Sequence, residues 1–170
     1  MGKIKNAHRD DGLLKWGLSC YKEVFLLELV FLTDKFYSDY ADCTEIERKL
    51  SRPHLCAAFL INGLLCCVPF RSNINHEYAI WTDKENKCGL DFSKTVVITD
   101  REKYIDGSRQ ARLRPNEYKV FKTVSEHDVK TTMDKYLKQY RRAKAAPQAR
   151  HNKTLLKYSC IQYFEEYFDV

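Results

Sequence analysis

The sequence predicts an α+β fold with a small, mostly antiparallel β-sheet and a helical C-terminal third. Strand-prone segments occupy the first two-thirds of the chain, whereas helical periodicity dominates the last third. The dipeptide Asn62-Gly63 between two apolar runs is typical of a two-residue hairpin turn. Strands and helices do not alternate along the chain, so a parallel sheet is not expected. We expect the sheet to curve strongly into a barrel-like core with helices at its periphery.

The composition is that of one folded domain. Of the 170 residues, 29 are Lys or Arg and 23 are Asp or Glu, and the resulting charge of +6 favours polyanionic partners such as nucleic acid. The longest apolar run, residues 24–32, is far shorter than the roughly 20 residues that cross a bilayer. Residues 1–26 lack a secretory signal pattern. We therefore expect a cytoplasmic protein, with residues 27–170 as a single domain and residues 1–26 as an extension.

The first strand and the first helix follow from residue types. Residues 28–32 are strand-prone, and residues 33–34, a threonine and an aspartate, end the strand. Either of these two can cap a short helix that ends near residue 40. A second short helix is expected over residues 44–50, before the break at Pro53. Three aromatic residues share one side of the first helix at spacings of three and four: Phe36, Tyr37 and Tyr40.

The strongest local signal is a hairpin. Residues 54–61 are apolar, Asn62-Gly63 suits a turn with positive φ at both positions, and residues 64–70 form the return strand. A polar segment, residues 71–77, follows where this strand ends. Loops at strand ends often present functional side chains.

The middle of the chain contains further strand signals. Residues 78–82 are expected to form a strand, followed by a polar turn over residues 83–87. Residues 89–94 lead into another strand at 95–99, and residues 110–113 give a weak strand signal.

Three helices are expected in the last third. Pro115 suits the first position of a helix that ends near residue 124. Ser125 and Asp128 have the spacing of a capping box for a longer helix to residue 145, and Asn152 can cap a final helix. The long helix should bury a stripe of five residues: Val129, Met133, Tyr136, Leu137 and Tyr140.

Several functional classes are disfavoured by missing motifs. The chain contains no phosphate-binding G-x-x-x-x-G-K-[ST] loop, no G-x-G-x-x-G, no H-E-x-x-H and no G-x-S-x-G. Its acidic residues do not cluster as a two-metal nuclease requires. Its seven cysteines, an odd number without a C-x-x-C pair, are expected to be reduced and mostly buried. We expect no metal and no cofactor.

The polar loop and a nearby lysine contain the groups needed for metal-free RNA cleavage. That chemistry requires a proton acceptor for the ribose 2′-hydroxyl, a proton donor for the leaving 5′-oxygen, and cations or hydrogen-bond donors around the phosphate. These groups are Arg71, Ser72, Asn75, His76 and Lys94. The loop could equally be a solvated surface segment, and Lys94 could extend over the sheet without contacting substrate.

Three tyrosines could stack on unpaired bases, or they could pack in the core: Tyr37, Tyr40 and Tyr78. The basic face of the long helix could be a phosphate track or a solvated surface. The residue types do not decide between these alternatives.

An ordered series of motifs resembles the TenpN branch of the ToxN-like family of type III toxin–antitoxin toxins. In that family an I-x-G turn, a strand ending in P-[LF]-x-S and a later G-L-x-x-x-K recur in this order. The resemblance begins near Leu29 and extends to the C-terminus. Its segments are Phe36-Tyr-Ser-Asp-Tyr40, Glu45-Ile-Glu-Arg-Lys49, Arg52-Pro53, Ile61-Asn-Gly63, Pro69-Phe-Arg-Ser72, His76-Glu-Tyr78 and Gly89-Leu-Asp-Phe-Ser-Lys94.

The resemblance implies a metal-independent endoribonuclease with a β-barrel core related to the Kid and MazF-like toxins. Such a toxin is inhibited by a small RNA pseudoknot that it cuts from a repeated precursor, and toxin and RNA form closed hetero-oligomers. The products would be 2′,3′-cyclic phosphate and 5′-hydroxyl ends on cellular or phage RNA.

The family's active-site positions fall on Ser72, Arg71 and Lys94 here, and we add His76 as a candidate for proton transfer. Ser72 and Arg71 would hold the phosphate, Lys94 would stabilise its developing charge, and His76 would transfer a proton. The lysine that ToxN has two residues after the serine is Ile74 here, so Arg71, His76 or Lys94 must supply that charge. Substrate contacts are assigned to Tyr37, Tyr40, Lys49, Arg52, Asn75, Tyr78 and Lys153.

Two other functions use the same residues. A non-catalytic RNA-binding module would hold RNA in the same basic groove without cutting it. A protein-interaction domain with incidental positive charge would bind nucleic acid with little dependence on salt.

Overall fold

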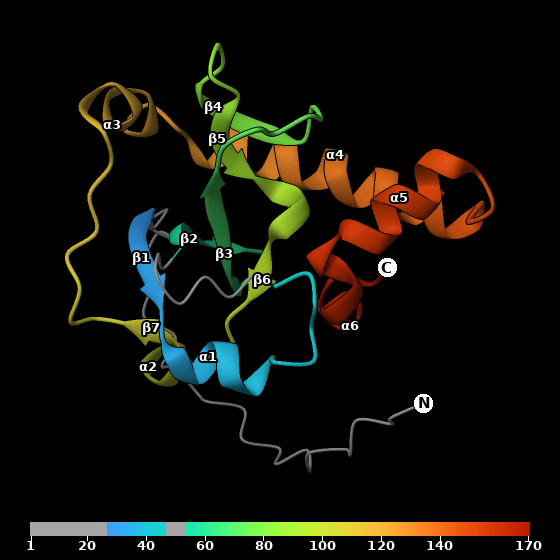
Figure 1. Cartoon of the computed structure of the whole chain (residues 1–170), viewed down its shortest axis with the longest axis horizontal. Coiled ribbons are helices and arrows are strands. Elements are labelled where there is room, and N and C mark those ends of the chain that lie inside the picture. The colour runs from blue at the N-terminus through green and yellow to red at the C-terminus, as the bar shows by residue number, and fades with distance from the viewer. Residues whose placement is uncertain (1–26, 47–53) are drawn as a thin grey trace, which may run out of the picture.

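The computed structural model describes residues 27–46 and 54–170 and has the predicted α+β architecture (Figure 1). One antiparallel sheet has the strand order β4-β5-β3-β2-β1-β7, and β6 pairs with β3 beside this path. The strands are β1 (Glu28–Leu32), β2 (Leu55–Ile61), β3 (Leu64–Arg71), β4 (Ala79–Asp83), β5 (Cys88–Asp91), β6 (Val96–Val97) and β7 (Ile105–Asp106). The helices are α1 (Asp34–Asp39), α2 (Arg101–Tyr104), α3 (Pro115–Phe121), α4 (Glu126–Ala145), α5 (Arg150–Tyr158) and α6 (Glu165–Phe168), with 3-10 turns η1 (Phe92–Lys94) and η2 (Cys160–Tyr163).

The β2–β3 hairpin forms the centre of the sheet, as the sequence predicts. Asn62 and Gly63 have φ values of 51° and 79°, which suit a tight turn that matches the twist of the strands. The register pairs Ile61 with Leu64 and extends to Cys56 opposite Pro69. Four consecutive residues of β2 are buried, so both faces of this strand are covered.

The expected closure into a barrel is not formed by the described strands. β4 and β7 stand at the two ends of the strand order and do not pair with each other. β7 contributes only two residues, which pair with Phe31 and Leu32 of β1. A strand of two residues cannot continue the hydrogen-bond ladder around a closed sheet, so the sheet stays open.

Several short elements differ from the prediction. Residues 89–94 were expected only to lead into a strand, but residues 88–91 form β5. The strand expected at 95–99 is limited to β6. Residues 110–113 form no strand. α2 and β7 were not predicted, because elements of two to four residues are too short to show a period.

The N-terminal helix is confirmed. Thr33 is its cap, and the threonine Oγ1 accepts a hydrogen bond from the Phe36 amide. Residues 44–46 of the expected second helix form turns and a bend, and residues 47–50 lie outside the described range.

The long helix α4 is confirmed together with its cap. Ser125 and Asp128 form the predicted capping box, and all five residues of the predicted stripe are buried. Tyr136 donates a hydrogen bond of 2.6 Å to Ser159, and Tyr140 donates one of 2.7 Å to Glu165. These two bonds attach the C-terminal segment to α4.

The prediction for the last helix is wrong in its first residue and in its length. α5 begins at Arg150, so Asn152 lies inside it, where the Asn152 amide donates to the Ala146 carbonyl. The helical path then stops at Ser159, whose hydroxyl accepts from the amide of Ile161 and starts η2. Side-chain bonding to the backbone at Ser159 replaces the continuous helix that the spacing suggested.

The cysteines behave as buried thiols. Cys56, Cys66, Cys67, Cys88 and Cys160 are buried, and Cys43 is half-buried. The six cysteines within the described ranges form no disulfide; Cys20 lies outside them. Burial raises the pKa of Cys56, Cys66 and Cys160 to about 12. Within the described part of the chain, no helix has the length and apolar character needed to cross a membrane.

Candidate functional site

A buried carboxylate, Asp91, connects two residues of the predicted site. Asp91 is 1% exposed and stands at the junction of β5 and η1. Its Oδ2 lies 3.0 Å from Nη1 of Arg71, and its Oδ1 lies 3.2 Å from Nε2 of His76. Ser93 donates to Oδ1 through its amide at 3.0 Å and its hydroxyl at 2.6 Å. The carboxylate therefore holds the guanidinium and the imidazole near each other.

The surroundings of Asp91 keep this carboxyl ionised. Burial alone would raise its pKa, but hydrogen bonds from His76 and Ser93 and the charges of His76 and Arg71 outweigh burial, and the pKa is lowered. An ionised Asp91 acts as a fixed anion that orients the Arg71 guanidinium and the His76 ring.

Strand pairing brings Arg71 to Asp91. Arg71 is the last residue of β3 and pairs with Gly89 of β5, and Phe70 pairs with Leu90. A Cβ at Gly89 would lie 2.3 Å from the carbonyl oxygen of Ile80 in β4. The glycine of the Gly89…Lys94 motif therefore permits the close approach of β4 and β5, which sets the position of Asp91 two residues later.

A second charged pair lies at the end of η1. Nζ of Lys94 is 2.9 Å from Oε2 of Glu45, and their side chains are only 12% and 16% exposed. Cys160 donates to the backbone carbonyl of Glu45 at 3.2 Å. Glu45 thus contacts η1 through Lys94 and η2 through Cys160.

Arg71 also contributes to the wall of a pocket that contains this second pair. The pocket is mostly apolar, and its polar groups come from Glu45, Arg71 and Lys94, together with Tyr37 and His54. The cavity has a volume of about 40 Å³ and opens to solvent. Arg71, Lys94 and Glu45 thus line a single cavity whose surface is mostly apolar. A few polar groups in a mostly apolar pocket are typical of a site that orients a ligand.

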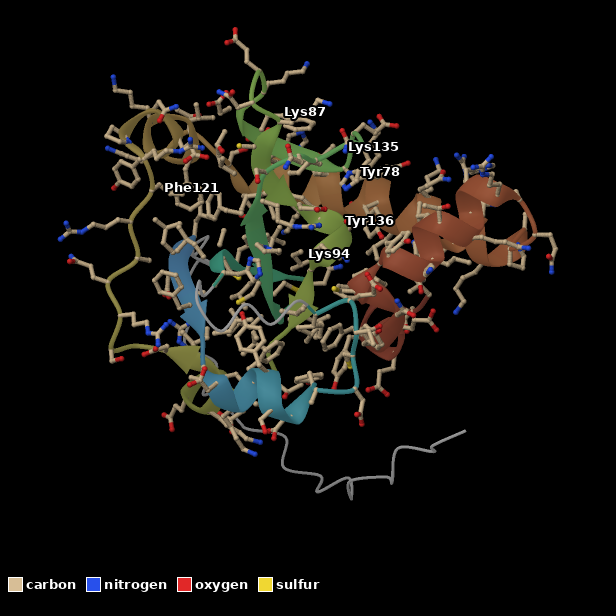
Figure 2. The ribbon with its side chains drawn as sticks, in the orientation of Figure 1. Tyr78, Lys87, Lys94, Phe121, Lys135 and Tyr136 are labelled. Carbon is tan, nitrogen blue, oxygen red and sulfur yellow. The ribbon has the colours of Figure 1, made fainter. Side chains whose placement is uncertain are left out.

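His76 lies between the buried carboxylate and an aromatic cluster. Its ring centroid is 5.9 Å from that of Tyr78, which is 5.2 Å from that of Tyr136 on α4. The labelled rings of Tyr78 and Tyr136 lie where α4 passes β4 (Figure 2). Nδ1 of His76 is buried and has no hydrogen-bond partner among the described residues. Asp91 contacts the other ring nitrogen, Nε2, so Nδ1 is the nitrogen that could exchange a proton with a ligand once it is uncovered.

The structure groups some predicted site residues and separates others. Arg71 and Lys94 share the pocket, and His76 joins them through Asp91. Ser72 is exposed and does not line the pocket. Asn75 accepts a hydrogen bond of 3.0 Å from Lys87 at the surface.

The predicted substrate-binding residues are also dispersed. Tyr37 is 8% exposed and lines the pocket from the core side. Tyr40 packs on Phe36 and Phe164. Tyr78 is half-buried, and Lys153 is exposed on α5. Lys49 and Arg52 lie outside the described residues.

Sequence reasoning missed three residues of this site: Glu45, Asp91 and Ser93. Asp91 and Ser93 occupy the variable positions of the Gly89…Lys94 motif, and Glu45 begins a quoted family segment. A carboxylate two residues before a serine was the available signal, because an Asp or Ser side chain often bonds a backbone amide two residues on. The pairing of Glu45 with Lys94, 49 residues apart, has no local signal.

No group of three or more His, Cys, Asp or Glu side chains within residues 27–46 and 54–170 has metal-site geometry. Comparisons with protein-family models, with curated proteins and with solved structures find no match to this chain. The resemblance to the ToxN-like toxins therefore rests on the motifs of the sequence.

Proposed function

We propose that this chain is a metal-independent endoribonuclease, the toxin of a bacterial type III toxin–antitoxin system. The observation that carries the proposal is the double role of Arg71. Its guanidinium lies 3.0 Å from the carboxylate that holds His76, and the same side chain lines the pocket with Lys94 and Glu45. Two cations, an imidazole and a second carboxylate are the groups that metal-free RNA cleavage requires.

In the proposed reaction, the ribose 2′-oxygen attacks the adjacent phosphorus and the bond from phosphorus to the 5′-oxygen breaks. Arg71 and Lys94 bind the non-bridging phosphate oxygens and stabilise their charge. Glu45 accepts the 2′-hydroxyl proton, and His76 as imidazolium gives a proton to the leaving 5′-oxygen. The products are a 2′,3′-cyclic phosphate and a 5′-hydroxyl, and no water is consumed.

The proposal requires two local movements when RNA binds. Lys94 must exchange its contact with Glu45 for a phosphate oxygen, which also frees the carboxylate to act as a base. Nδ1 of His76 is covered, so its ring or the loop of residues 72–77 must shift to reach the 5′-oxygen. Catalytic contacts commonly tighten only in the substrate complex.

The motifs supply the rest of the proposal. By resemblance, the partner is a small antitoxin RNA pseudoknot that the toxin processes, and toxin and RNA assemble into a hetero-oligomer in the cytoplasm. A relationship to the Kid and MazF-like toxins belongs to the same proposal; the catalytic arrangement itself does not depend on a closed barrel.

The test is expression in bacteria from a tightly repressed promoter, with growth and RNA 5′ ends measured in the same cultures. The variants are His76→Gln and the double variant Glu45→Gln/Lys94→Met, which avoids leaving one charge of a buried pair unpaired. Lys84→Gln, at an exposed turn, is the matched control. Wild type and control should arrest growth and produce new 5′-hydroxyl ends, whereas His76→Gln and the double variant should lose about 100-fold or more of the cleavage rate.

Purified protein separates the remaining outcomes. Cleavage should persist in excess EDTA, and 5′-phosphate ends would contradict the mechanism. Retained cleavage by the folded double variant would exclude the pocket as the site. A soluble wild type that binds RNA but creates no new RNA ends would establish the RNA-binding module instead. The observation that favours this second candidate function is that Lys94 is already paired with Glu45.

A further inference from the structure

The positive charge of the chain is concentrated in one helical hairpin. Residues 135–158, the second half of α4 and the whole of α5, contain eight Lys or Arg and no Asp or Glu. The whole chain has a charge of +6, so the other 146 residues together carry −2 (+6 less +8). The cations are Lys135, Lys138, Arg141, Arg142, Lys144, Arg150, Lys153 and Lys157.

Six of these cations form two stripes with the same spacing. One stripe is Lys135, Lys138 and Arg142 on α4, and the other is Arg150, Lys153 and Lys157 on α5. Positions i, i+3 and i+7 lie within about 60° of arc on a helix and span about 10 Å along it. All six residues are exposed, and each stripe faces away from the buried residues of its own helix.

Most of these charges have no carboxylate partner among residues 27–46 and 54–170. Lys135 pairs with Glu77, and Lys144 pairs with Glu165 at 2.9 Å. Lys138, Arg142 and all three cations of the α5 stripe have no ion pair within the described part of the chain. Six like charges on a short hairpin repel each other and stay hydrated, so folding alone does not account for their placement.

The hairpin is a firm support for these stripes. It projects from the sheet beside the C-terminal turn (Figure 1). The Tyr136 and Tyr140 hydroxyls bind Ser159 and Glu165, and Asn152 donates at 2.8 Å to the Ala146 carbonyl at the end of α4. Burial raises the pKa of both tyrosines, so these hydroxyls remain protonated donors.

We infer that the α4–α5 hairpin binds the phosphate backbone of double-helical RNA. Rows of exposed cations suit the phosphates of a nucleic-acid backbone, and such contacts are independent of sequence. A single-strand site would need a series of stacking rings, but Tyr158, with Lys157 5.1 Å from its ring, is the one exposed aromatic residue on α5. A membrane-binding helix would need an exposed apolar face, and Leu155 and Leu156 of α5 are half-buried.

The choice of RNA over DNA rests on the proposed function. The inference that the hairpin binds a phosphate backbone rests on its own exposed cations. In that context, the hairpin would hold a structured region of the RNA while the pocket acts on a flexible one.

The test measures binding of a labelled 20-base-pair RNA duplex of arbitrary sequence to the full chain across a salt series. The α5-stripe variant is Arg150→Gln/Lys153→Gln/Lys157→Gln. The control, Lys84→Gln/Lys119→Gln/Lys122→Gln, removes the same charge from exposed sites and matches the Lys–Tyr contact, because Lys122 lies 5.6 Å from the ring of Tyr118. A DNA duplex and vesicles containing phosphatidylserine are the other two ligands.

The α5-stripe variant should bind the RNA duplex at least about tenfold more weakly at 0.1 M salt, and its slope of log K against log salt should be smaller by about 2–3. The control should keep the wild-type slope. Equal losses in both variants, wild-type binding by the stripe variant, or a preference for vesicles would overturn the inference. Equal affinities of the wild type for the RNA and DNA duplexes would support the phosphate contact and overturn the assignment to RNA.

The outcomes of the binding assay and of the cleavage assay distinguish a failure of this inference from a failure of the proposed function. If the hairpin binds duplex RNA and the wild type never cleaves RNA, the inference stands and the endoribonuclease does not. If the wild type cleaves RNA and the stripe variant binds the duplex normally, the endoribonuclease stands and the hairpin surface does not.

Discussion

The residue with the largest local influence is Asp91. It is almost fully buried, and it contacts Arg71, His76 and Ser93 within 2.6–3.2 Å. Removing one partner of a buried charged cluster costs more than the cluster itself contributes, because the remaining groups keep their desolvation penalty. Arg71 and His76 are about one-third exposed, which lets water compensate in part.

Asp91→Asn should lower the free energy of unfolding by about 1–3 kcal/mol and abolish the proposed cleavage, because Arg71 and His76 lose their common anchor. Urea denaturation and the RNA-end assay measure the two effects. Asp134→Asn, on the exposed surface of α4, is the control and should change stability by less than about 0.5 kcal/mol. Equal stability of the two variants would show that Asp91 does not organise the site.

The lowered pKa of Asp91 predicts a pH dependence. A carboxyl whose pKa is lower in the folded than in the unfolded state stabilises the protein fully above its unfolded value of about 3.8, and this stabilisation is lost as the pH falls through the folded-state pKa. The difference in unfolding free energy between wild type and Asp91→Asn should therefore be constant above about pH 5 and shrink below about pH 4. Urea titrations from pH 2.5 to 7 measure it. A difference that grows in acid would contradict the assigned direction.

At the scale of elements, short-range chemistry explains the best predictions. The Asn62-Gly63 turn and the Ser125–Asp128 capping box depend on residues that are adjacent or three apart, and both formed as expected. β5 was missed because its four residues include Gly89 and Asp91, which are poor strand formers. Gly89 is required there by the approach of the Ile80 carbonyl rather than by strand propensity.

The hairpin turn predicts a contrast between two glycines. A Cβ at Gly63 or at Gly107 would have nothing within 4 Å, but Gly63 has a φ of +79°. Gly63→Ala should therefore destabilise the protein by about 1–2 kcal/mol, whereas Gly107→Ala should be neutral or stabilise it by up to about 1 kcal/mol. Thermal unfolding of both variants gives the comparison. Similar losses in both variants would contradict the role assigned to the backbone conformation of Gly63.

At the scale of the whole molecule, the core contains cysteine side chains as well as aliphatic and aromatic ones. Cys66 and Cys67 are adjacent in β3 and are both fully buried, which requires cover on both faces of the sheet. β6 pairs with these same two residues. Access to them therefore depends on opening the whole domain.

The buried thiols should be protected from alkylation. At pH 8, Cys43 should react with iodoacetamide first among the described cysteines, whereas Cys56, Cys66 and Cys160 should react only after global unfolding, because burial raises their pKa to about 12 and excludes the reagent. Mass spectrometry of peptides from a labelling time course resolves each site. Urea-unfolded protein is the control. Rapid native labelling of Cys66 would contradict the arrangement of the sheet.

The sequence alone determined the α+β class, the central hairpin, and the capping box and buried stripe of α4. Each depends on residues close together in the chain, where turn geometry, capping and helical period act directly. The chemical types of Arg71, His76 and Lys94 made them candidates for the proposed site.

Only the tertiary structure decided how those residues are connected. Asp91 meets Arg71 through strand pairing across 20 residues, and Glu45 meets Lys94 across 49. Whether the sheet closes likewise depends on which distant strands become its edges, and β4 and β7 remain apart. Contacts between distant residues depend on how the elements pack together, and no periodicity within a single segment contains that information.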